Sequence, residues 1–286
     1  MTEGLYRRGG LFLLFGGLSL AAVVLGAVVS AANGVPASTW VRNLAAWGVG
    51  AMAGGAISAL ARPGAATLAV CAAPVGLAAS FLSPDLESVH RWIDLGPVHL
   101  NVAMLLLPAS IVGLATLTPE RRWPWAVVAI ALGLLAAQPD ASQATALAAA
   151  TAVIAAVAIR QPAARLAVVT AAAGLAALAW LRPDPLTPVA EVEGIIGLAF
   201  TLSPWVAGLA LALLTAMAVT PVICTVKQQR TSRLAGVALG LCLLVWAIMP
   251  FLGAFPVPLI GMGMSPIIGA WLGVGLLATL MRRGDG

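Results

Sequence analysis

The feature that most limits the fold is a series of apolar runs, each roughly 18 or more residues long, that recur along the whole chain. Lipid offers the backbone no hydrogen-bond partners, so such a run crosses a bilayer as a helix that satisfies its own peptide groups. Hydrophobic residues occupy 61% of the 286 positions and charged residues only 9%, against about 25% charged in soluble domains. The sequence therefore predicts an all-α, polytopic integral membrane protein and excludes a water-soluble globule.

Ten spans can be assigned within the single transmembrane domain that we expect residues 1–286 to form. The first apolar run is long, has no small-residue cleavage site and is followed by further spans, so we interpret it as a retained helix and not as a signal peptide. The eighth span is long, and Ser203 and Pro204 within it predict a kink. The predicted spans are 11–33, 41–61, 65–82, 98–118, 124–138, 142–159, 165–181, 195–225, 233–252 and 264–281.

The basic residues test this count. With the N-terminus in the cytoplasm, twelve of the 15 lysines and arginines fall on the inner side, and only Arg42, Arg91 and Arg182 fall on the outer side. The positive-inside rule predicts this asymmetry. We therefore predict ten spans in a bacterial inner membrane with both termini cytoplasmic, and this topology explains the net charge of +5 without nucleic acid. The inner residues are Arg7, Arg8, Arg62, Arg121, Arg122, Arg160, Arg165, Lys227, Arg230, Arg233, Arg282 and Arg283.

The acidic residues show the opposite bias. Seven of the ten, and both histidines, fall in polar segments at the outer side, which are residues 83–101, 138–143, 181–194 and 253–266. Folding in a membrane does not require such a cluster of titratable side chains, so it marks the outer end as the predicted place of function. The outer carboxylates are Asp85, Glu87, Asp94, Asp140, Asp184, Glu191 and Glu193.

Three of the outer segments carry motifs that resemble those of one family. Residues 88–96 read SVHRWIDLG, residues 138–144 read QPDASQA and residues 255–265 read FPVPLIGMGMS. They are similar to G-A-x-R-W-L-x-L-G, Q-P-D-L-G-T-A and L-P-L-P-F-I-S-Y-G-G-S of the SEDS family (shape, elongation, division and sporulation), to which RodA and FtsW belong. The motifs occur in the same order, on the same loops. The resemblance implies a ten-helix SEDS-like bundle and a role in cell-wall peptidoglycan assembly, in cell shape or division.

Two departures from the family pattern are clear. The family motif Q-P-S-E-F-A-K aligns with residues 101–107, NVAMLLL, where both the glutamate and the lysine are lost. That lysine is expected to pair with the aspartate of Q-P-D, here Asp140, so Arg91 or Arg182 would have to replace it. The long loop of the family between spans seven and eight is shortened here to 181–194, and the family's proposed catalytic aspartate aligns with Pro183, next to Asp184.

The resemblance implies glycosyl transfer from an undecaprenyl-linked precursor at the outer leaflet. Such a reaction needs a base for the acceptor hydroxyl and positive charge for the departing pyrophosphate. We expect Asp184 to be the base, with Glu191 as a second catalytic candidate. The expected substrate-binding residues, all at the outer side, are His90, Arg91, Trp92, Asp94, Asp140 and Glu193.

Each of these residues also has a structural interpretation. Asp184 lies between prolines and can cap a turn. Arg91 can pair with Asp94 or Asp85 within its own loop. Trp92 is a typical interface anchor, and Asp140 is a favoured helix N-cap.

We predict no metal-ligand residues from spacing alone, because His90 and His99 are nine residues apart and the three cysteines lie singly in apolar runs. By resemblance only, the chain would use a divalent cation, Mg or Mn, and a single-span transpeptidase as partner, besides the lipid-linked saccharide precursor and membrane lipid. Two alternatives stay open: a non-catalytic scaffold or precursor-binding homologue, and a flippase, which would carry buried charges in mid-span. In either case the four outer segments should meet.

Overall fold

The computed structural model describes residues 8–96 and 98–282, and these are mostly helical. Among them, seven helices are long and apolar enough to cross a membrane, and three shorter apolar helices, α3, α4 and α5, accompany them. This confirms a multi-pass membrane architecture. The elements are α1 (Arg8–Ala32), α2 (Ala37–Leu60), α3 (Ala65–Ser80), β1 (Trp92–Leu95), β2 (Val98–Asn101), α4 (Val102–Leu117), α5 (Trp123–Ala137), α6 (Ala141–Ala158), α7 (Pro162–Leu181), α8 (Ile195–Leu202), α9 (Pro204–Thr225), α10 (Arg230–Ile248), the short 3-10 helix η2 (Met249–Phe251) and α11 (Met264–Arg282).

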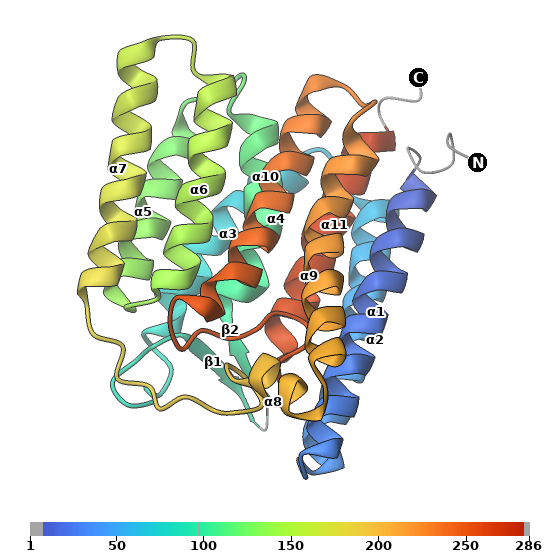
Figure 1. The fold of residues 1–286 in the computed structure, drawn as a ribbon. Coiled ribbons are helices and arrows are strands. Elements are labelled where there is room, and N and C mark those ends of the chain that lie inside the picture. The colour runs from blue at the N-terminus through green and yellow to red at the C-terminus, as the bar shows by residue number, and fades with distance from the viewer. Residues whose placement is uncertain (1–7, 97, 283–286) are drawn as a thin grey trace.

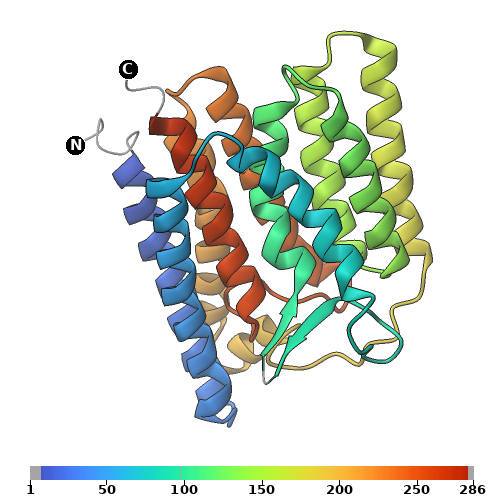
Figure 2. The same ribbon diagram turned by 180° about the vertical axis from the view of Figure 1, so that it is seen from behind.

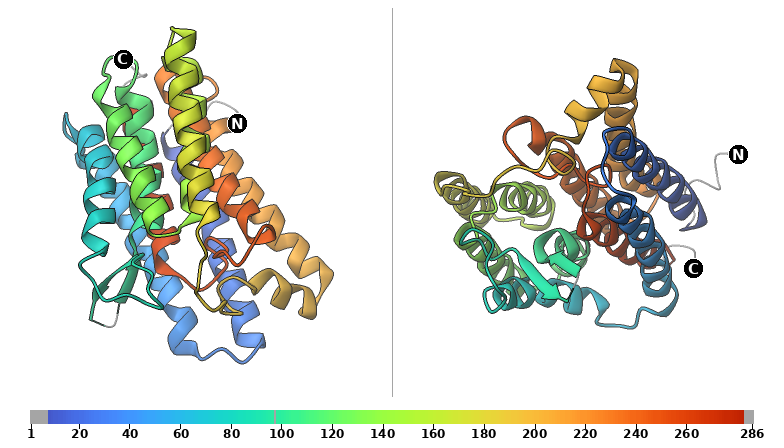
Figure 3. Two further views of the ribbon diagram at one scale, coloured as in Figure 1. Left: turned by 90° about the vertical axis from the view of Figure 1, so that its left-hand side faces the viewer. Right: turned by 90° about the horizontal axis from the view of Figure 1, so that it is seen from below.

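The helices form one bundle with two flanks (Figure 1). Helices α1 and α2 lie on one side, and α5, α6 and α7 on the other, as the view from behind also shows (Figure 2). Between the flanks, α11 packs on α2 and α4, while α10 packs on α9, α6 and α4. Helices α4, α10 and α11 therefore form the centre of the molecule, which the end-on view in Figure 3 shows most directly.

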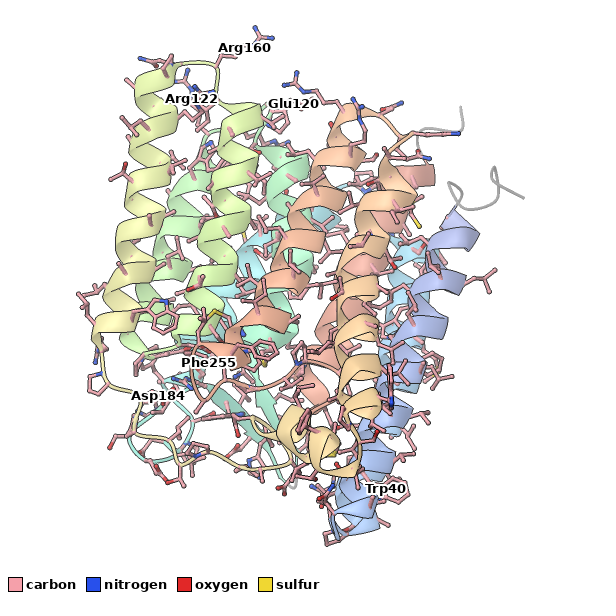
Figure 4. The ribbon with its side chains drawn as sticks, in the orientation of Figure 1. Trp40, Glu120, Arg122, Arg160, Asp184 and Phe255 are labelled. Atoms are coloured by element: carbon pink, nitrogen blue, oxygen red, sulfur yellow. The ribbon has the colours of Figure 1, made fainter. Side chains whose placement is uncertain are left out.

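The two ends of the bundle differ. Both ends of the described chain lie at one end, and the hairpin β1–β2, helix α8 and the long loops lie at the other (Figures 1 and 2). Figure 4 places Glu120, Arg122 and Arg160 at the first end and Asp184 at the second. This agrees with the predicted separation of basic and outer acidic residues. Arg7 and Arg283, which the topology argument also used, lie outside the described residues.

Small residues let the central helices approach closely. A Cβ added at Gly275 of α11 would lie 2.5 Å from the carbonyl oxygen of Gly54 on α2. On the other side of α11, a Cβ at Gly269 would overlap the carbonyl oxygen of Met104 on α4. In lipid, where apolar burial gives helices little reason to associate, such backbone contacts supply much of the packing energy.

The all-α prediction needs one correction. The span predicted at 98–118 begins as a strand, because residues 98–101 pair antiparallel with residues 92–95, Trp92 opposite Asn101 and Leu95 opposite Val98. Helix α4 starts only at Val102, where the Asn101 side chain accepts a hydrogen bond from the Met104 N–H at 2.9 Å. The apolar pattern of the segment extends through the strand, so it could not mark this boundary.

The span predicted at 195–225 is broken and not merely kinked. Helix α8 ends at Leu202, Ser203 adopts an extended conformation with φ −171° and ψ 142°, and α9 starts at Pro204. Proline has no N–H to donate and disfavours a helical residue before it, while the Ser203 hydroxyl caps the new helix by accepting from the Trp205 N–H at 3.2 Å. The other predicted spans agree with helices to within a few residues.

Candidate functional site

Arg91 makes the contacts that connect the loops at the end of the bundle that carries the hairpin β1–β2. Its Nη2 donates to Asp184 Oδ2 at 2.7 Å and to the carbonyl oxygen of Pro139 at 2.6 Å. Its Nε lies 3.8 Å from Asp140 Oδ2 and donates to the carbonyl oxygen of Gln138 at 3.4 Å. One side chain therefore joins three of the four polar segments. The pairing of Arg91 with Asp94 or Asp85, which we considered from the sequence, is not formed.

Asp140 is buried beside Arg91, with 3% of its surface exposed. It is the N-cap of α6, since its Oδ1 accepts from the Gln143 N–H at 3.3 Å and from the Ser142 hydroxyl at 3.1 Å. The predicted cap is thus confirmed. Burial raises the pKa of the Asp140 carboxyl, and the Arg91 guanidinium and these two hydrogen bonds oppose the rise. Of the two arginines considered as the basic partner of Asp140, Arg91 is the one that the structure places beside it.

Asp184 approaches Arg91 from the loop after α7. Its side chain is 27% exposed, in contrast with that of Asp140, and Figure 4 shows it on the long loop at the outer end. Its Oδ2 is paired with Arg91, and its Oδ1 accepts only a long hydrogen bond from the Leu186 N–H, 3.3 Å. The predicted turn cap is therefore present, and the Asp184 side chain stays partly exposed.

A second layer of polar side chains holds the turn between α5 and α6. Gln138 Nε2 donates to the Ser80 hydroxyl at 2.6 Å, and Ser80 donates to the carbonyl oxygen of His90 at 2.8 Å. On the other side, the Trp246 indole N–H donates to Gln143 Oε1 at 2.8 Å. Sequence reasoning did not assign roles to these residues, although Gln138 and Gln143 lie within the Q-P-D motif segment.

The glycine- and proline-rich segment 253–266 completes the site. The Asn101 N–H donates to the Ser265 hydroxyl at 2.8 Å, which ties this segment to the hairpin. The Val257 N–H donates to the carbonyl oxygen of Val192 at 3.1 Å, which ties it to the loop of Asp184. Asn43 of α2 holds it from behind, donating to the carbonyl oxygen of Gly261 at 2.9 Å. The predicted meeting of the four outer segments is therefore confirmed.

Two adjoining cavities lie between these segments. The smaller, about 40 Å³, is lined by Arg91, Asp140 and Asp184 together with Trp92 and Glu193. The larger, about 260 Å³, shares Trp92 and Glu193 and extends to Ser265 and Pro266. A water molecule occupies about 30 Å³, so the smaller cavity holds little more than solvent. The larger approaches the roughly 300–1,000 Å³ of ordinary ligand pockets.

Glu193 contributes a carboxyl group to both cavities. Its Oε2 accepts from the Val189 N–H at 2.8 Å. Burial raises the pKa of the Glu193 carboxyl, that hydrogen bond lowers it, and the charges of Asp184 and Glu191 add to the rise. Glu193 therefore keeps its proton to higher pH than an exposed glutamate does.

Three of the predicted site residues lie apart from the residues that line the cavities. The ring of His90 packs against Phe81, with centroids 5.5 Å apart. Asp94 Oδ1 lies 2.5 Å from His99 Nδ1 across the hairpin. Glu191 contributes its backbone, since its carbonyl oxygen accepts from the Met262 N–H at 2.8 Å. The structure thus brings Arg91, Trp92, Asp140, Asp184 and Glu193 together and leaves these three outside.

The carboxylates of the site do not converge on a common point. In the described part of the chain, no group of three or more histidine, cysteine, aspartate or glutamate side chains is arranged to hold a metal ion. Asp140 and Asp184 instead face the Arg91 guanidinium. The residues present therefore do not fit a divalent cation in this arrangement.

Comparison with solved structures decides the fold. Two crystal structures of the rod shape determining protein RodA from Thermus thermophilus, one of them a mutant, match over 95% of this chain and 97% of that chain. Sequence identity is 20% in both, and the TM-scores are 0.73 and 0.72. The chain has the RodA fold. This confirms the SEDS-like bundle that the motifs predicted.

A third match is to a chain of a multi-protein complex. A chain of a structure described as a peptidoglycan synthase complex, in which polymerization and crosslinking are coordinated, aligns with 19% identity and a TM-score of 0.67. The match covers 94% of this chain and 97% of that chain. Protein-family models and curated proteins gave no match. At these identities the likeness establishes the RodA fold, and activity has to be argued from the site.

Proposed function

We propose that this protein is a SEDS-like cell-wall polymer assembly protein that transfers glycan from an undecaprenyl-linked precursor at the outer leaflet of the bacterial inner membrane. The observation that carries this proposal is the Arg91–Asp184 pair, 2.7 Å apart, at the wall of a cavity built from four separate segments. It lies at the end of a RodA fold that the charge distribution assigns to the outside. The proposal includes a topology of ten membrane spans with both termini in the cytoplasm.

In the proposed reaction, Asp184 accepts the proton of the acceptor hydroxyl through Oδ1, the oxygen that does not pair with Arg91. The hydroxyl oxygen then bonds to the anomeric carbon of the donor sugar, and the bond from that carbon to the lipid pyrophosphate breaks. The bonding electrons leave with the pyrophosphate, whose negative charge the nearby Arg91 guanidinium stabilises. Glu193, which lines both cavities, hydrogen-bonds a sugar hydroxyl.

The test is polymerisation of purified lipid-linked disaccharide-peptide precursor by the full-length protein in lipid vesicles. General base catalysis contributes about 10²–10⁴-fold, so Asp184→Asn should lower the rate by that factor with an unchanged fold. Asp85→Asn is the matched control, because Asp85 is an exposed carboxylate on a predicted outer loop, and its one hydrogen bond within the described part of the chain comes from the Ser88 N–H. A rate that survives Asp184→Asn unchanged removes Asp184 from the mechanism.

A scaffold or precursor-binding role is the second candidate, and the small size of the cavity at Arg91, about 40 Å³, favours it. A scaffold would give no polymer from the wild type, with or without a single-span transpeptidase partner, but would still bind the precursor. A flippase is less well supported. Among the described residues the only buried charged side chains are Arg91 and Asp140, both at the outer end, and none lies in mid-span.

The divalent cation is a proposal from the family resemblance alone, and no step above runs through it. Its measurement is the polymerisation rate after chelation with EDTA and again after Mg or Mn is restored. The resemblance predicts that the rate falls on chelation and returns with the cation.

A further inference from the structure

A second polar cavity lies at the opposite end of the bundle, where the described chain begins and ends. It measures about 520 Å³ and lies between α2, α3, α4, α10 and α11, with Arg62 and Arg121 among its lining residues. We propose that it binds the phosphate of an anionic phospholipid, one acyl chain of which lies in an adjoining apolar groove. This site is separate from the Arg91 site and does not depend on the proposed polymerisation.

The cavity has uncompensated positive charge. Neither Arg62 nor Arg121 forms a salt bridge with any described residue. Glu120 also lines the cavity and faces the same space, so the three charges sum to about +1 at neutral pH. A phosphodiester carries one negative charge and matches this sum, whereas the headgroup of a zwitterionic lipid brings its own cation.

Two helices add partial positive charge at the same place. The first residues of α3, Ala65 to Thr67, and of α10, Thr231 and Ser232, line the cavity. The first N–H groups of a helix have no partner within the helix, and they favour a bound anion.

Ser58 supplies the independent observation that points to a ligand. It lines the cavity and is only 3% exposed, yet its hydroxyl has no hydrogen-bond partner in the described residues. Other buried helical hydroxyls, such as those of Ser19 and Thr151, donate to a carbonyl of the preceding turn, although Ser30 of α1 also lacks a partner among the described residues. A buried polar group without a partner is costly, and a phosphate oxygen would satisfy it.

The adjoining groove indicates a lipid and not a free anion. It measures about 490 Å³, runs between α2 and α3, and is lined by Ile57, Leu60 and Leu68. It shares the stretch from Ala61 to Ala65 with the polar cavity, so a headgroup in the cavity and an acyl chain in the groove can belong to one molecule.

The experiment is native mass spectrometry of the full-length protein with dioleoylphosphatidylglycerol, dioleoylphosphatidylcholine or inorganic phosphate. The wild type should retain one phosphatidylglycerol molecule in preference to phosphatidylcholine. Each arginine near an anionic headgroup is worth about a five-fold change in affinity, so Arg62→Gln with Arg121→Gln should weaken binding by about 25-fold. Ser58→Ala should also weaken phosphatidylglycerol binding, and it should leave the stability of the lipid-free protein unchanged. If the hydroxyl had a purely structural role, the substitution would lower that stability.

Arg122→Gln is the matched control, since Arg122 neighbours Arg121 but does not line the cavity. It should leave phosphatidylglycerol binding unchanged. Equal retention of phosphatidylcholine overturns the proposal, and so does an equal loss in the Arg122 variant, which would indicate diffuse charge attraction. Full displacement of the lipid by millimolar inorganic phosphate overturns the lipid assignment in favour of a free-anion site.

Discussion

Arg91 balances two carboxylates that differ in their surroundings. It is 7% exposed, and it is bonded at 2.7 Å to the partly exposed Asp184 but lies 3.8 Å from the buried Asp140. The SEDS pattern expects a lysine on the following helix, and here that helix carries only apolar residues at 102–107. The positive charge beside Asp140 comes instead from Arg91 on the preceding loop.

Removal of the Arg91 charge should destabilise the protein strongly. Loss of one partner from a buried ion pair costs about 3–5 kcal/mol, and we expect Arg91→Gln to cost about 2–4 kcal/mol because Asp184 is partly screened by solvent. The free energy of unfolding in bicelles measures this. The double variant Arg91→Gln/Asp184→Asn should recover part of the loss, and additive losses would show that the pair is not coupled.

Asp140 should make stability depend on pH. Its folded pKa is raised above the ordinary 3.8 by burial, so the folded state holds the proton more tightly than the unfolded state. The favourable contribution is therefore complete below that ordinary value and is lost as pH rises through the folded pKa.

Asp140→Asn keeps a side chain able to cap α6 and removes the titration, so the slope of unfolding free energy against pH, above the ordinary value of 3.8, should become shallower. Asp140→Ala should cost about 1 kcal/mol more than the Asn variant, because it also removes the cap. An unchanged slope in the Asn variant would assign the pH dependence to another group, with Glu193 the first to examine.

Among the elements, α11 determines how closely the bundle can pack. It lies between α2 and α4, and both contacts are made through glycines against backbone. Trp271 on the same helix fills the space toward α1 and α2, with its ring 5.2 Å from Phe15 and 5.8 Å from Trp47. The segment 253–266 runs into the first turn of α11. The packing of α11 against its neighbours therefore also holds this segment in place.

Gly275→Ala should lower the free energy of unfolding by about 1–3 kcal/mol, since the added methyl group meets the backbone of Gly54, which cannot move aside cheaply. Gly174→Ala on α7 is the matched control, because nothing lies within 4 Å of its Cβ position. It should be neutral or slightly stabilising. Thermal unfolding in detergent compares the two, and equal effects would argue against close packing at Gly275.

At the scale of the whole molecule, the two ends carry opposite charge chemistry. The termini end carries Arg62, Arg121 and Arg160, and the other end carries the Arg91 site with its surrounding carboxylates. The RodA fold brings the basic loops to one end and the acidic loops to the other. This arrangement fits an inner-membrane protein whose reacting groups face outward.

The orientation can be measured directly. In a cysteine-free background, a membrane-impermeant thiol reagent added to intact spheroplasts should label Asp85→Cys and spare Arg160→Cys, because both positions are exposed but lie at opposite ends. After lysis both should react. Labelling of Arg160→Cys in intact cells would invert the topology and place the Arg91 site in the cytoplasm.

The sequence by itself determined the class of fold, the positions of most apolar helices and the loops that form the candidate site, because hydropathy and charge act locally and are legible along one chain. It also identified Arg91, Asp140 and Asp184 as candidates. Only the tertiary structure decided that Arg91 pairs with both aspartates and not with Asp94, since those contacts join residues 49 and 93 positions apart. It also decided that His90 and Glu191 face elsewhere, and that Asn43 and Ser265 hold the last segment. Such pairings depend on how the helices pack in three dimensions, and the periodicity of a single sequence does not predict that packing.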